Sequence, residues 1–208
     1  MVANRQAMTA NENRAAKLAE GRGRVAPAKL AHIVRRTARF DEMIDWYKTV
    51  LGAEVAHADG MLAFLTYDDE HHRIALAKIP GLPDRPILAA GTDHVAFTHR
   101  DLGDLLYTYM RLKVRGIEPY WCINHGPTTS MYYKDPDGNK IELQVDNFPT
   151  TDECNRWMRS GDFAANPIGV LFDPEDLLAR YRAGEPIEKL TTRPPLPEGK
   201  TAFEMLRF

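Results

Sequence analysis

The sequence contains little cysteine, almost no net charge and no long apolar run. Its 208 residues include only two cysteines, Cys122 and Cys154, and their spacing matches neither a CxxC pair nor a zinc finger. Each is therefore expected to be a buried thiol. A net charge of −2 and a pI near 6.4 give no basis for binding nucleic acid or a membrane surface.

The apolar runs are too short to span a bilayer, and residues 1–24 contain no apolar secretory core. We therefore expect a soluble, cytoplasmic protein without a nucleic-acid or membrane partner. The sequence is 44% hydrophobic and 27% charged, which is enough to bury a sizeable core in one compact domain or in two fused small modules.

Two stretches of the chain repeat one order of predicted elements. A helix is expected from Asp41, as N-cap, to Gly52, and another from Asp101 to Gly116. Around them the pattern predicts strands near residues 29–36, 53–57, 61–67 and 72–78 in the first copy, and 93–98, 120–124, 130–134 and 139–146 in the second. The repeated order β-α-β-β-β indicates an internal duplication.

This duplication predicts an α+β fold in which two βαβββ modules form one half-open barrel. The expected divisions are an N-terminal arm at 1–27, module 1 at 28–80, module 2 at 90–148 and a C-terminal extension at 149–208. We expect the extension to pack on the barrel or on a neighbouring subunit, because residues such as Phe172 are too apolar to lie in water.

Histidines occupy equivalent positions in the first strand of each module. His94 lies 62 residues after His32 (94 − 32 = 62). Side chains alternate along a strand, and the apolar neighbours Ile33 and Val95 suit the helix-packed face, so both histidines are expected on the opposite face. A single strand histidine is usually structural, whereas a histidine repeated in both modules favours a ligand.

A hairpin over residues 125–146 adds a carboxylate to the same face. Its turn is Asp135-Pro-Asp-Gly138, and the strand that follows alternates so that Glu142 lies opposite the apolar residues. Alone, Glu142 is either solvated or paired; together with His32 and His94 it favours a metal site. Two imidazoles and one carboxylate leave about three coordination positions free, as in non-haem Fe(II) sites that use O₂.

The span from Asn124 to Glu142 resembles a family signature. It has a histidine, five residues, an apolar residue and a tyrosine, then Asp-Pro-Asp-Gly and a glutamate four residues after that glycine. By this motif the chain is similar to the vicinal oxygen chelate superfamily, and within it to the single-barrel, type I extradiol ring-cleaving dioxygenases. The resemblance covers roughly residues 29–147 and implies the fold of glyoxalases and bleomycin-resistance proteins.

The resemblance also implies roles for individual residues. The implied metal ligands are His32, His94 and Glu142, holding Fe(II) or, with similar ligand preferences, Mn(II). His72 would be the acid–base histidine, and His125 and Tyr132 the hydrogen-bonding pair of the pocket. The implied reaction opens a catechol-type diol, of the catechol or 2,3-dihydroxybiphenyl kind, with O₂ to a semialdehyde-type product.

The chemistry of these side chains supports the same assignment. A histidine with a pKa of about 6.5 can take a proton from a metal-bound diol and return it later. His72 is preferred to its neighbour His71 for this work, because the alternation points His71 to the other face. Tyr132 can hold a substrate oxygen, and His125 can donate to the same region.

Two other classes stay open at this point. One is a metal-dependent isomerase, epimerase or thiol transferase of the same superfamily, which commonly draws a fourth ligand from the last strand of the first module. When the last strands of the two modules are aligned, Ala75 occupies the position of Glu142. The first module therefore has no carboxylate there, which favours the open three-ligand site. The other is a metal-free, resistance-type binding protein, for which a proton-transferring histidine has no use. We expect a catecholic substrate and O₂ as partners, and a homo-oligomer.

Overall fold

The computed structural model describes residues 23, 25–84, 86 and 90–207, in two compact units, Met1–His32 and Ile33–Phe208. In the first unit, the described residues 25–32 form neither helix nor strand. Most of the predicted N-terminal arm, at 1–22 and 24, lies outside the described residues. The second unit holds the elements described below.

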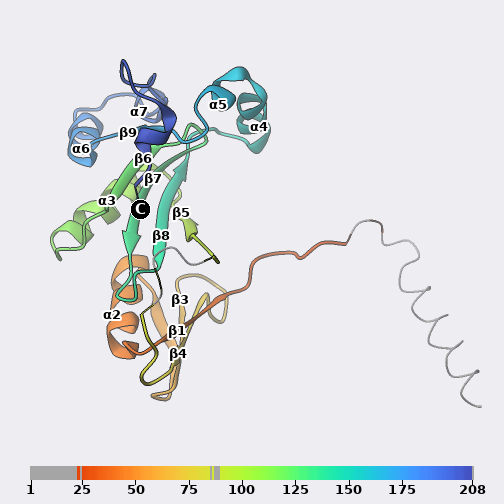
Figure 1. Ribbon diagram of the computed structural model, residues 1–208, viewed down its shortest axis with the longest axis vertical. Coiled ribbons are helices and arrows are strands. Elements are labelled where there is room, and N and C mark those ends of the chain that lie inside the picture. The colour runs from red at the N-terminus through yellow and green to blue at the C-terminus, as the bar shows by residue number, and fades with distance from the viewer. Residues whose placement is uncertain (1–22, 24, 85, 87–89, 208) are drawn as a thin grey trace, which may run out of the picture. The chain divides into compact units, whose positions relative to one another are not determined.

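Module 1 folds in the predicted order. It contains one helix on a four-stranded sheet of order β1-β4-β3-β2, in which β1 and β4 run parallel and the other pairs antiparallel. The elements are β1 (Ile33–Thr37), α2 (Phe40–Leu51), β2 (Glu54–Ala58), β3 (Leu62–Thr66) and β4 (Ile74–Lys78) (Figure 1). Gly52 ends α2 in the left-handed conformation, with φ of 65°, as its place after the last apolar residue predicts.

Module 2 repeats that order and adds a fifth strand from the C-terminal extension. Its sheet has the order β5-β8-β7-β6-β9, and among the described residues no strand pairing joins it to the first sheet. The elements are β5 (His94–Thr98), α3 (Leu102–Lys113), β6 (Trp121–Asn124), β7 (Thr128–Lys134), β8 (Lys140–Asp146) and β9 (Val170–Leu171). The Asp101 side chain caps α3 by accepting from the Asp104 amide at 2.9 Å, as predicted.

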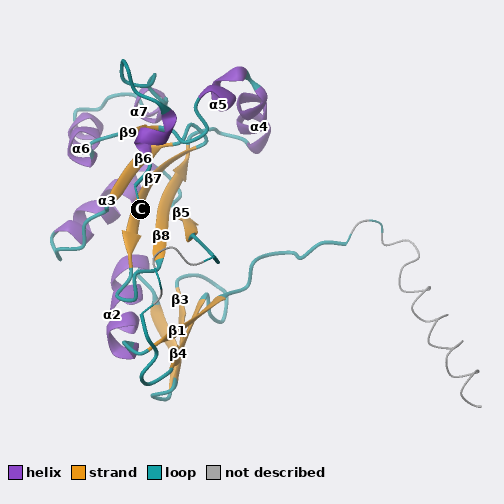
Figure 2. Ribbon diagram, in the orientation of Figure 1, coloured by secondary structure: helices purple, strands orange, loops and turns teal. Residues whose placement is uncertain are grey.

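One helix lies beside each sheet (Figure 2). Both have 12 residues, and α3 starts 62 residues after α2 (102 − 40 = 62), the offset that separates His32 from His94. Their buried stripes correspond, since Tyr47 and Tyr109 are both buried at the same offset. The apolar alternate residues of both sheets join these stripes in one core. The α+β fold with two βαβββ modules is therefore confirmed.

Two local predictions are wrong. The first strand begins at Ile33, not at Lys29, because its parallel pairing with β4 starts at Ile33 opposite Ile74. Asp41 is not the N-cap of α2, because the helix starts one residue earlier at Phe40 and Arg39 occupies the cap position without a side-chain cap bond. Asp41 instead lies in the first turn, where a carboxylate is favourable beside the helix N-terminus.

The hairpin turn of module 2 is bound to module 1. Gly138 adopts a φ of 77°, and the Asp135 carboxylate accepts from the Asn139 amide at 2.8 Å, so the turn forms as predicted. The hydroxyl of Tyr47 in α2 donates to Asp135 at 3.1 Å, and Arg39 pairs with Asp137 at 2.8 Å. These bonds hold the two modules together at the loop between β7 and β8.

The C-terminal extension gathers at one end of the second sheet, where β9 pairs with β6 (Figure 1). It contains four helices, α4 (Thr151–Arg159), α5 (Gly161–Ala165), α6 (Pro174–Arg182) and α7 (Ile187–Thr191), and a short 3-10 helix, η1 (Ala202–Met205). Across the described parts of the chain, every helix is too short or too polar to traverse a lipid bilayer.

Candidate metal and diol site

A buried carboxylate and a histidine meet on the second sheet. Glu142 on β8 is only 5% exposed, and its Oε2 lies 3.0 Å from Nε2 of His94 on β5. Burial alone would raise the pKa of Glu142, but hydrogen bonds from His94 and Ser130 outweigh it and lower that pKa. The hydrogen bond to Glu142 in turn raises the pKa of His94 to about 9.

Strand alternation brings these two side chains to the same face. On β5, Val95 and Phe97 pack against the core, and on β8 the residues on either side of Glu142 are buried in that core. His94 and Glu142 therefore project from the other face, the one turned away from α3, here called the inner face of the sheet. The parallel register sets Ala96 opposite Glu142, so the small alanine leaves the imidazole room to reach the carboxylate.

The histidine is oriented by a second carboxylate. His94 Nδ1 lies 2.9 Å from Oδ2 of Asp93, whose other oxygen accepts from Lys140 at 3.0 Å. A carboxylate on one ring nitrogen fixes the tautomer and leaves the other nitrogen as the donor to a metal, which is the usual arrangement behind a metal-bound histidine. Asp93 thus presents Nε2 of His94 to the space beside Glu142.

A tyrosine and a second histidine border this pair. Tyr132 on β7 is the cross-strand partner of Glu142, and its ring meets that of His94 edge to face at 5.3 Å. Its hydroxyl lies 3.0 Å from Nε2 of His125, which stands just beyond β6. Burial first, and then the charge of Glu142, raises the pKa of Tyr132, so this hydroxyl stays protonated and can donate.

The tautomer of His125 follows from its other contact. Its Nδ1 contacts the carbonyl oxygen of Ile168, and because a carbonyl can only accept, Nδ1 carries the proton. Burial lowers the pKa of His125, which favours the neutral ring with an unprotonated Nε2. Nε2 can therefore accept a hydrogen bond from Tyr132 or from a bound hydroxyl group.

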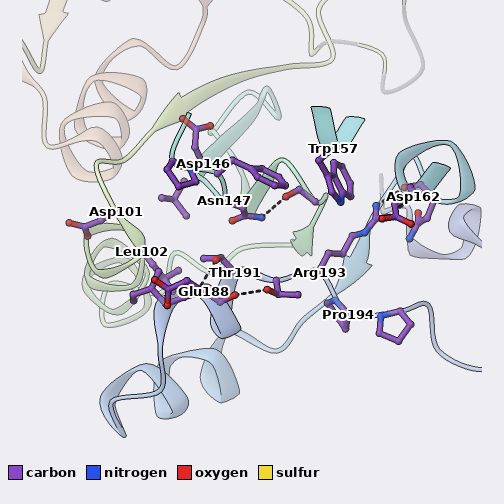
Figure 3. Close-up of a pocket in the computed structure, with 18 of the residues that line it drawn as sticks. Asp101, Leu102, Asp146, Asn147, Trp157, Asp162, Glu188, Thr191, Arg193 and Pro194 are labelled. Carbon is purple, nitrogen blue, oxygen red and sulfur yellow. Dashed lines mark hydrogen bonds between the residues drawn. The ribbon is translucent and has the colours of Figure 1, made fainter. Parts of the chain in front are cut away.

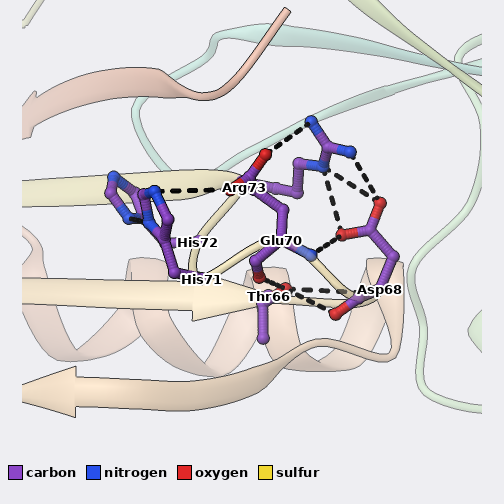
Figure 4. Close-up of polar contacts among 6 residues, drawn as sticks. All are labelled: Thr66, Asp68, Glu70, His71, His72 and Arg73. Carbon is purple, nitrogen blue, oxygen red and sulfur yellow. Dashed lines mark hydrogen bonds and ion pairs between the residues drawn. The ribbon is translucent and has the colours of Figure 1, made fainter. Parts of the chain in front are cut away.

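His72 lies in module 1, in the connection between β3 and β4. It stacks on Phe64 with ring centroids 4.6 Å apart and an interplanar angle of 20°. Ala63 and Leu65 on either side of Phe64 are buried in the core, so Phe64 and His72 lie on the face turned away from α2. His71, whose side chain is 69% exposed, lies 3.3 Å from Glu70 and also contacts His72, with the two Nδ1 atoms 2.5 Å apart (Figure 4).

The structure thus brings four of the six predicted site residues together. Those residues are His94, His125, Tyr132 and Glu142. His72 lies in module 1, just before β4, and His32 is exposed in the first unit, outside the strand that follows it. Among the described residues of the chain, no third His, Cys, Asp or Glu joins His94 and Glu142 in a metal-binding group.

Three residues of the site were missed by the sequence argument. Asp93 orients His94, Ser130 donates to Glu142, and Trp121 stacks on Tyr132 with centroids 4.5 Å apart. Asp93 could have been found as the acidic neighbour of the repeated histidine, and Ser130 by its alternation with Tyr132. Trp121 depends on the β6–β7 register, which the sequence alone does not fix.

Comparison with known proteins gives matches over most of this region. The model of the Glyoxalase/Bleomycin resistance protein/Dioxygenase superfamily matches residues 29–143. Biphenyl-2,3-diol 1,2-dioxygenase 2 of Rhodococcus globerulus is 49% identical over 168 residues, covering 80% of this chain and 88% of that protein. Biphenyl-2,3-diol 1,2-dioxygenase 3 of the same organism is 46% identical, covering 79% of this chain and 88% of that protein.

Among solved structures, the glyoxylase/bleomycin resistance protein/dioxygenase domain from Frankia sp. EAN1pec superposes with a TM-score of 0.51. The match covers 60% of this chain and 96% of that domain, at 17% identity. This likeness supports the fold of the two modules.

Proposed function

Because the chain belongs to the Glyoxalase/Bleomycin resistance protein/Dioxygenase superfamily, we propose that it is an extradiol dioxygenase, which opens a catechol-type diol with O₂ to a semialdehyde-type product. The family predicted from the hairpin motif is thereby confirmed. The observation that carries the proposal is the buried pair of His94 and Glu142, bordered by Tyr132 and His125, in a chain 49% identical to a biphenyl-2,3-diol 1,2-dioxygenase.

The donor atoms present fit a divalent metal. Two donors that bind one cation at about 2.1 Å and at right angles lie about 3 Å apart. His94 Nε2 and Glu142 Oε2 are 3.0 Å apart, and Asp93 holds the ring in the tautomer that a ligand needs. We assign His94 and Glu142 as ligands and His32 as the third, with Fe(II) as the metal and Mn(II) as the nearest alternative.

The protein residues would then divide the remaining work. A bound metal supplies Lewis-acid activation of the diol and electron transfer to O₂. The unprotonated Nε2 of His125 can accept a hydrogen bond from a diol hydroxyl, and the Tyr132 hydroxyl can donate one to a diol oxygen. His72 is the proposed acid–base residue, taking a proton from the diol and returning it to the product.

The burial of the site suits this chemistry. Trp121 and Tyr132 form an apolar wall on the inner face, together with Ile123 and Met205. Such a wall excludes water and strengthens the hydrogen bonds that orient a flat aromatic ring.

The decisive experiment measures oxygen consumption by the Fe(II)-loaded protein. The full-length chain is prepared without oxygen, loaded with Fe(II), and mixed with catechol or 2,3-dihydroxybiphenyl and ¹⁸O₂. We expect a yellow product, one O₂ consumed per diol and both labelled atoms in the product. Parallel samples with Mn(II) and Zn(II) identify the productive metal.

Two results would contradict the proposal. No colour and no O₂ uptake with any of a panel of catechols would exclude ring cleavage. Turnover of a substrate without O₂, with a preference for Zn(II) or Ni(II), would instead support an isomerase or thiol transferase on the same scaffold.

A further inference from the structure

The C-terminal extension surrounds the main chain of His125. Asn124 donates from its side-chain amide to the Thr191 carbonyl at 2.8 Å. Gly169 packs so closely that a Cβ there would lie 2.9 Å from the His125 Cα, and its φ of 125° favours glycine. The extension therefore contacts both the side chain of Asn124 and the main chain of His125.

One guanidinium group links the histidine to the segment that holds its ring. Arg193 donates from Nη1 to the His125 carbonyl at 3.2 Å and to the Asn166 carbonyl at 2.7 Å. From Nη2 it donates to the Asp162 carbonyl at 2.9 Å. The Asn166 side chain in turn holds the segment around Ile168. Its Oδ1 accepts from the Ile168 amide at 3.2 Å and from the Gly169 amide at 2.8 Å. The Ile168 carbonyl that holds the His125 ring therefore lies in the same segment that Arg193 ties to His125.

An aromatic ring keeps Arg193 in place. The Arg193 guanidinium carbon lies 4.8 Å from the centroid of the Trp157 ring in α4, and that ring also packs against Gly126. Arg193 points between Trp157 and Asp162 at the wall of a cavity of about 1020 Å³ (Figure 3). The cavity leaves space into which the Arg193 side chain could move. The three hydrogen bonds to carbonyls and the Trp157 ring therefore hold the side chain, and steric crowding does not.

We propose that Arg193 is the positioning residue for His125. By bonding the His125 carbonyl and the segment that carries the Ile168 carbonyl, it keeps the imidazole in the Nδ1–H tautomer and aims Nε2 at the Tyr132 hydroxyl. The catalytic consequence rests on the proposed function, in which His125 contacts the bound diol. The positioning itself does not depend on that function.

The test compares Arg193→Met and Arg193→Lys with Arg180→Met in the full-length protein. Lysine keeps the charge but cannot reach three carbonyls with one planar group. Arg180, also in the extension, bonds Glu185 at 2.8 Å and makes no described contact with the β6–β7 loop, so it is the matched control.

Nitrogen-15 NMR of the imidazole rings in the Zn(II)-loaded protein gives a readout independent of turnover. In the wild type and in Arg180→Met we expect a single Nδ1–H tautomer for His125. In Arg193→Met we expect both tautomers in exchange, and in Arg193→Lys a smaller admixture.

The kinetic readout uses the Fe(II) enzyme and 2,3-dihydroxybiphenyl. We expect Arg193→Met to lower kcat about 10- to 100-fold with KM changed by less than about threefold, because displacement of a reacting group by about 1 Å costs rates of this order. Should Arg193→Met fail to fold, Arg193→Lys carries the same test with a smaller drop.

An unchanged tautomer in both Arg193 variants would overturn the proposal, even if their melting temperatures fell, because the role would then be structural only. A changed tautomer in Arg180→Met would overturn it equally. If the wild type showed no ring cleavage, the proposed function would fail while the tautomer result still decided the positioning role.

Discussion

The two modules have the same order of elements, but corresponding strands differ in their exposure to solvent. Strand β2 of module 1 is exposed at all five residues, whereas its counterpart β6 in module 2 is buried at three of four. The difference arises because β9 and the C-terminal extension cover β6, while β2 remains an uncovered edge. The same fold therefore provides one sheet with a solvent-exposed edge and one sheet that is buried enough to keep polar side chains in defined hydrogen-bonded pairs.

Equivalent positions of the two modules show where chemistry has been added. In the first sheet Val34 stands opposite Ala75, and in the second Ala96 stands opposite Glu142. Since Ala96 is 62 residues after Val34 (96 − 34 = 62), Ala75 is the structural counterpart of Glu142, as the sequence alignment predicted. At this strand position the carboxylate is found in module 2, whose inner face supplies it with hydrogen-bond partners. An unpartnered buried charge would be costly.

The helix starts differ in the same sense. Asp101 caps α3, whereas the equivalent Arg39 (101 − 39 = 62) leaves α2 without a side-chain cap. Arg39 instead forms ion pairs with Asp84 and with Asp137 of the module 2 turn. Module 1 thus gives up a local cap at this position and gains a contact that helps to fix the hairpin of module 2.

The largest expected effect comes from removing the carboxylate that distinguishes the modules. Glu142→Ala makes the second sheet resemble the first at this position. We expect activity of the Fe(II) enzyme to fall by roughly a thousandfold or more, since a bound metal contributes several kcal/mol to the reaction. Elemental analysis after dialysis should show loss of the metal. Gln144→Ala, two residues along the same strand face, should retain both, and equal metal content in the two variants would contradict the assignment.

The next effect tests the polar pair that only module 2 contains. Tyr132→Phe removes the hydroxyl beside His125 Nε2, and we expect kcat to fall about 10- to 100-fold. Because the two groups share one hydrogen bond, His125→Gln combined with Tyr132→Phe should cost less than the sum of the single changes. Tyr133→Phe is the matched control, since its ring lies in the main core on the opposite face. Additive losses would show that the two residues act separately.

Much of the site could be predicted because strand alternation is a local property. The positions of His94 and Glu142 on one face follow from their apolar neighbours, and the Asp-Pro-Asp-Gly turn places Tyr132 opposite Glu142 once the hairpin closes. The fold followed equally from the repeated element order. These predictions required no knowledge of long-range packing.

The rest depends on contacts between distant parts of the chain. Arg193 lies 68 residues from His125, and no periodicity connects them. The start of the first strand was misplaced because its first residue is set by pairing with β4, not by its own sequence. Likewise Arg39 at the start of α2 is explained by its ion pairs with Asp84 and with Asp137, the second of which is 98 residues away.

A smaller effect concerns the cover over module 2. A Cβ at Gly126 would lie 2.1 Å from the Trp157 ring, at a φ of 100°. We expect Gly126→Ala to lower the free energy of unfolding by about 2 to 5 kcal/mol, through backbone strain and overpacking together. Gly138→Ala, at a φ of 77° but facing open space, carries only the strain of about 1 to 2 kcal/mol. Urea titration measures both, and equal losses would mean that Trp157 yields without cost.

The smallest expected effect comes from replacing a residue of module 2 with its counterpart from module 1. His99 at the end of β5 corresponds to Thr37 at the end of β1 (99 − 37 = 62), and His99 Nε2 is buried without a hydrogen-bond partner among the described residues. Burial lowers the pKa of His99, so below about pH 6.5 the unfolded chain binds a proton that the folded chain does not.

Stability should therefore fall as the pH drops, and one such proton accounts for at most about 1.4 kcal/mol between pH 7.5 and 5.5. His99→Thr removes this contribution, so its urea midpoint should change less over that range than the wild-type midpoint does. Thr98→Ser, which keeps the hydroxyl that accepts from Gln144 and changes no titratable group, should keep the wild-type slope. If His99→Thr also kept that slope, His99 would take up its proton as readily in the folded protein as in the unfolded chain, and the buried end of β5 would be as open to water as the uncovered edge of module 1.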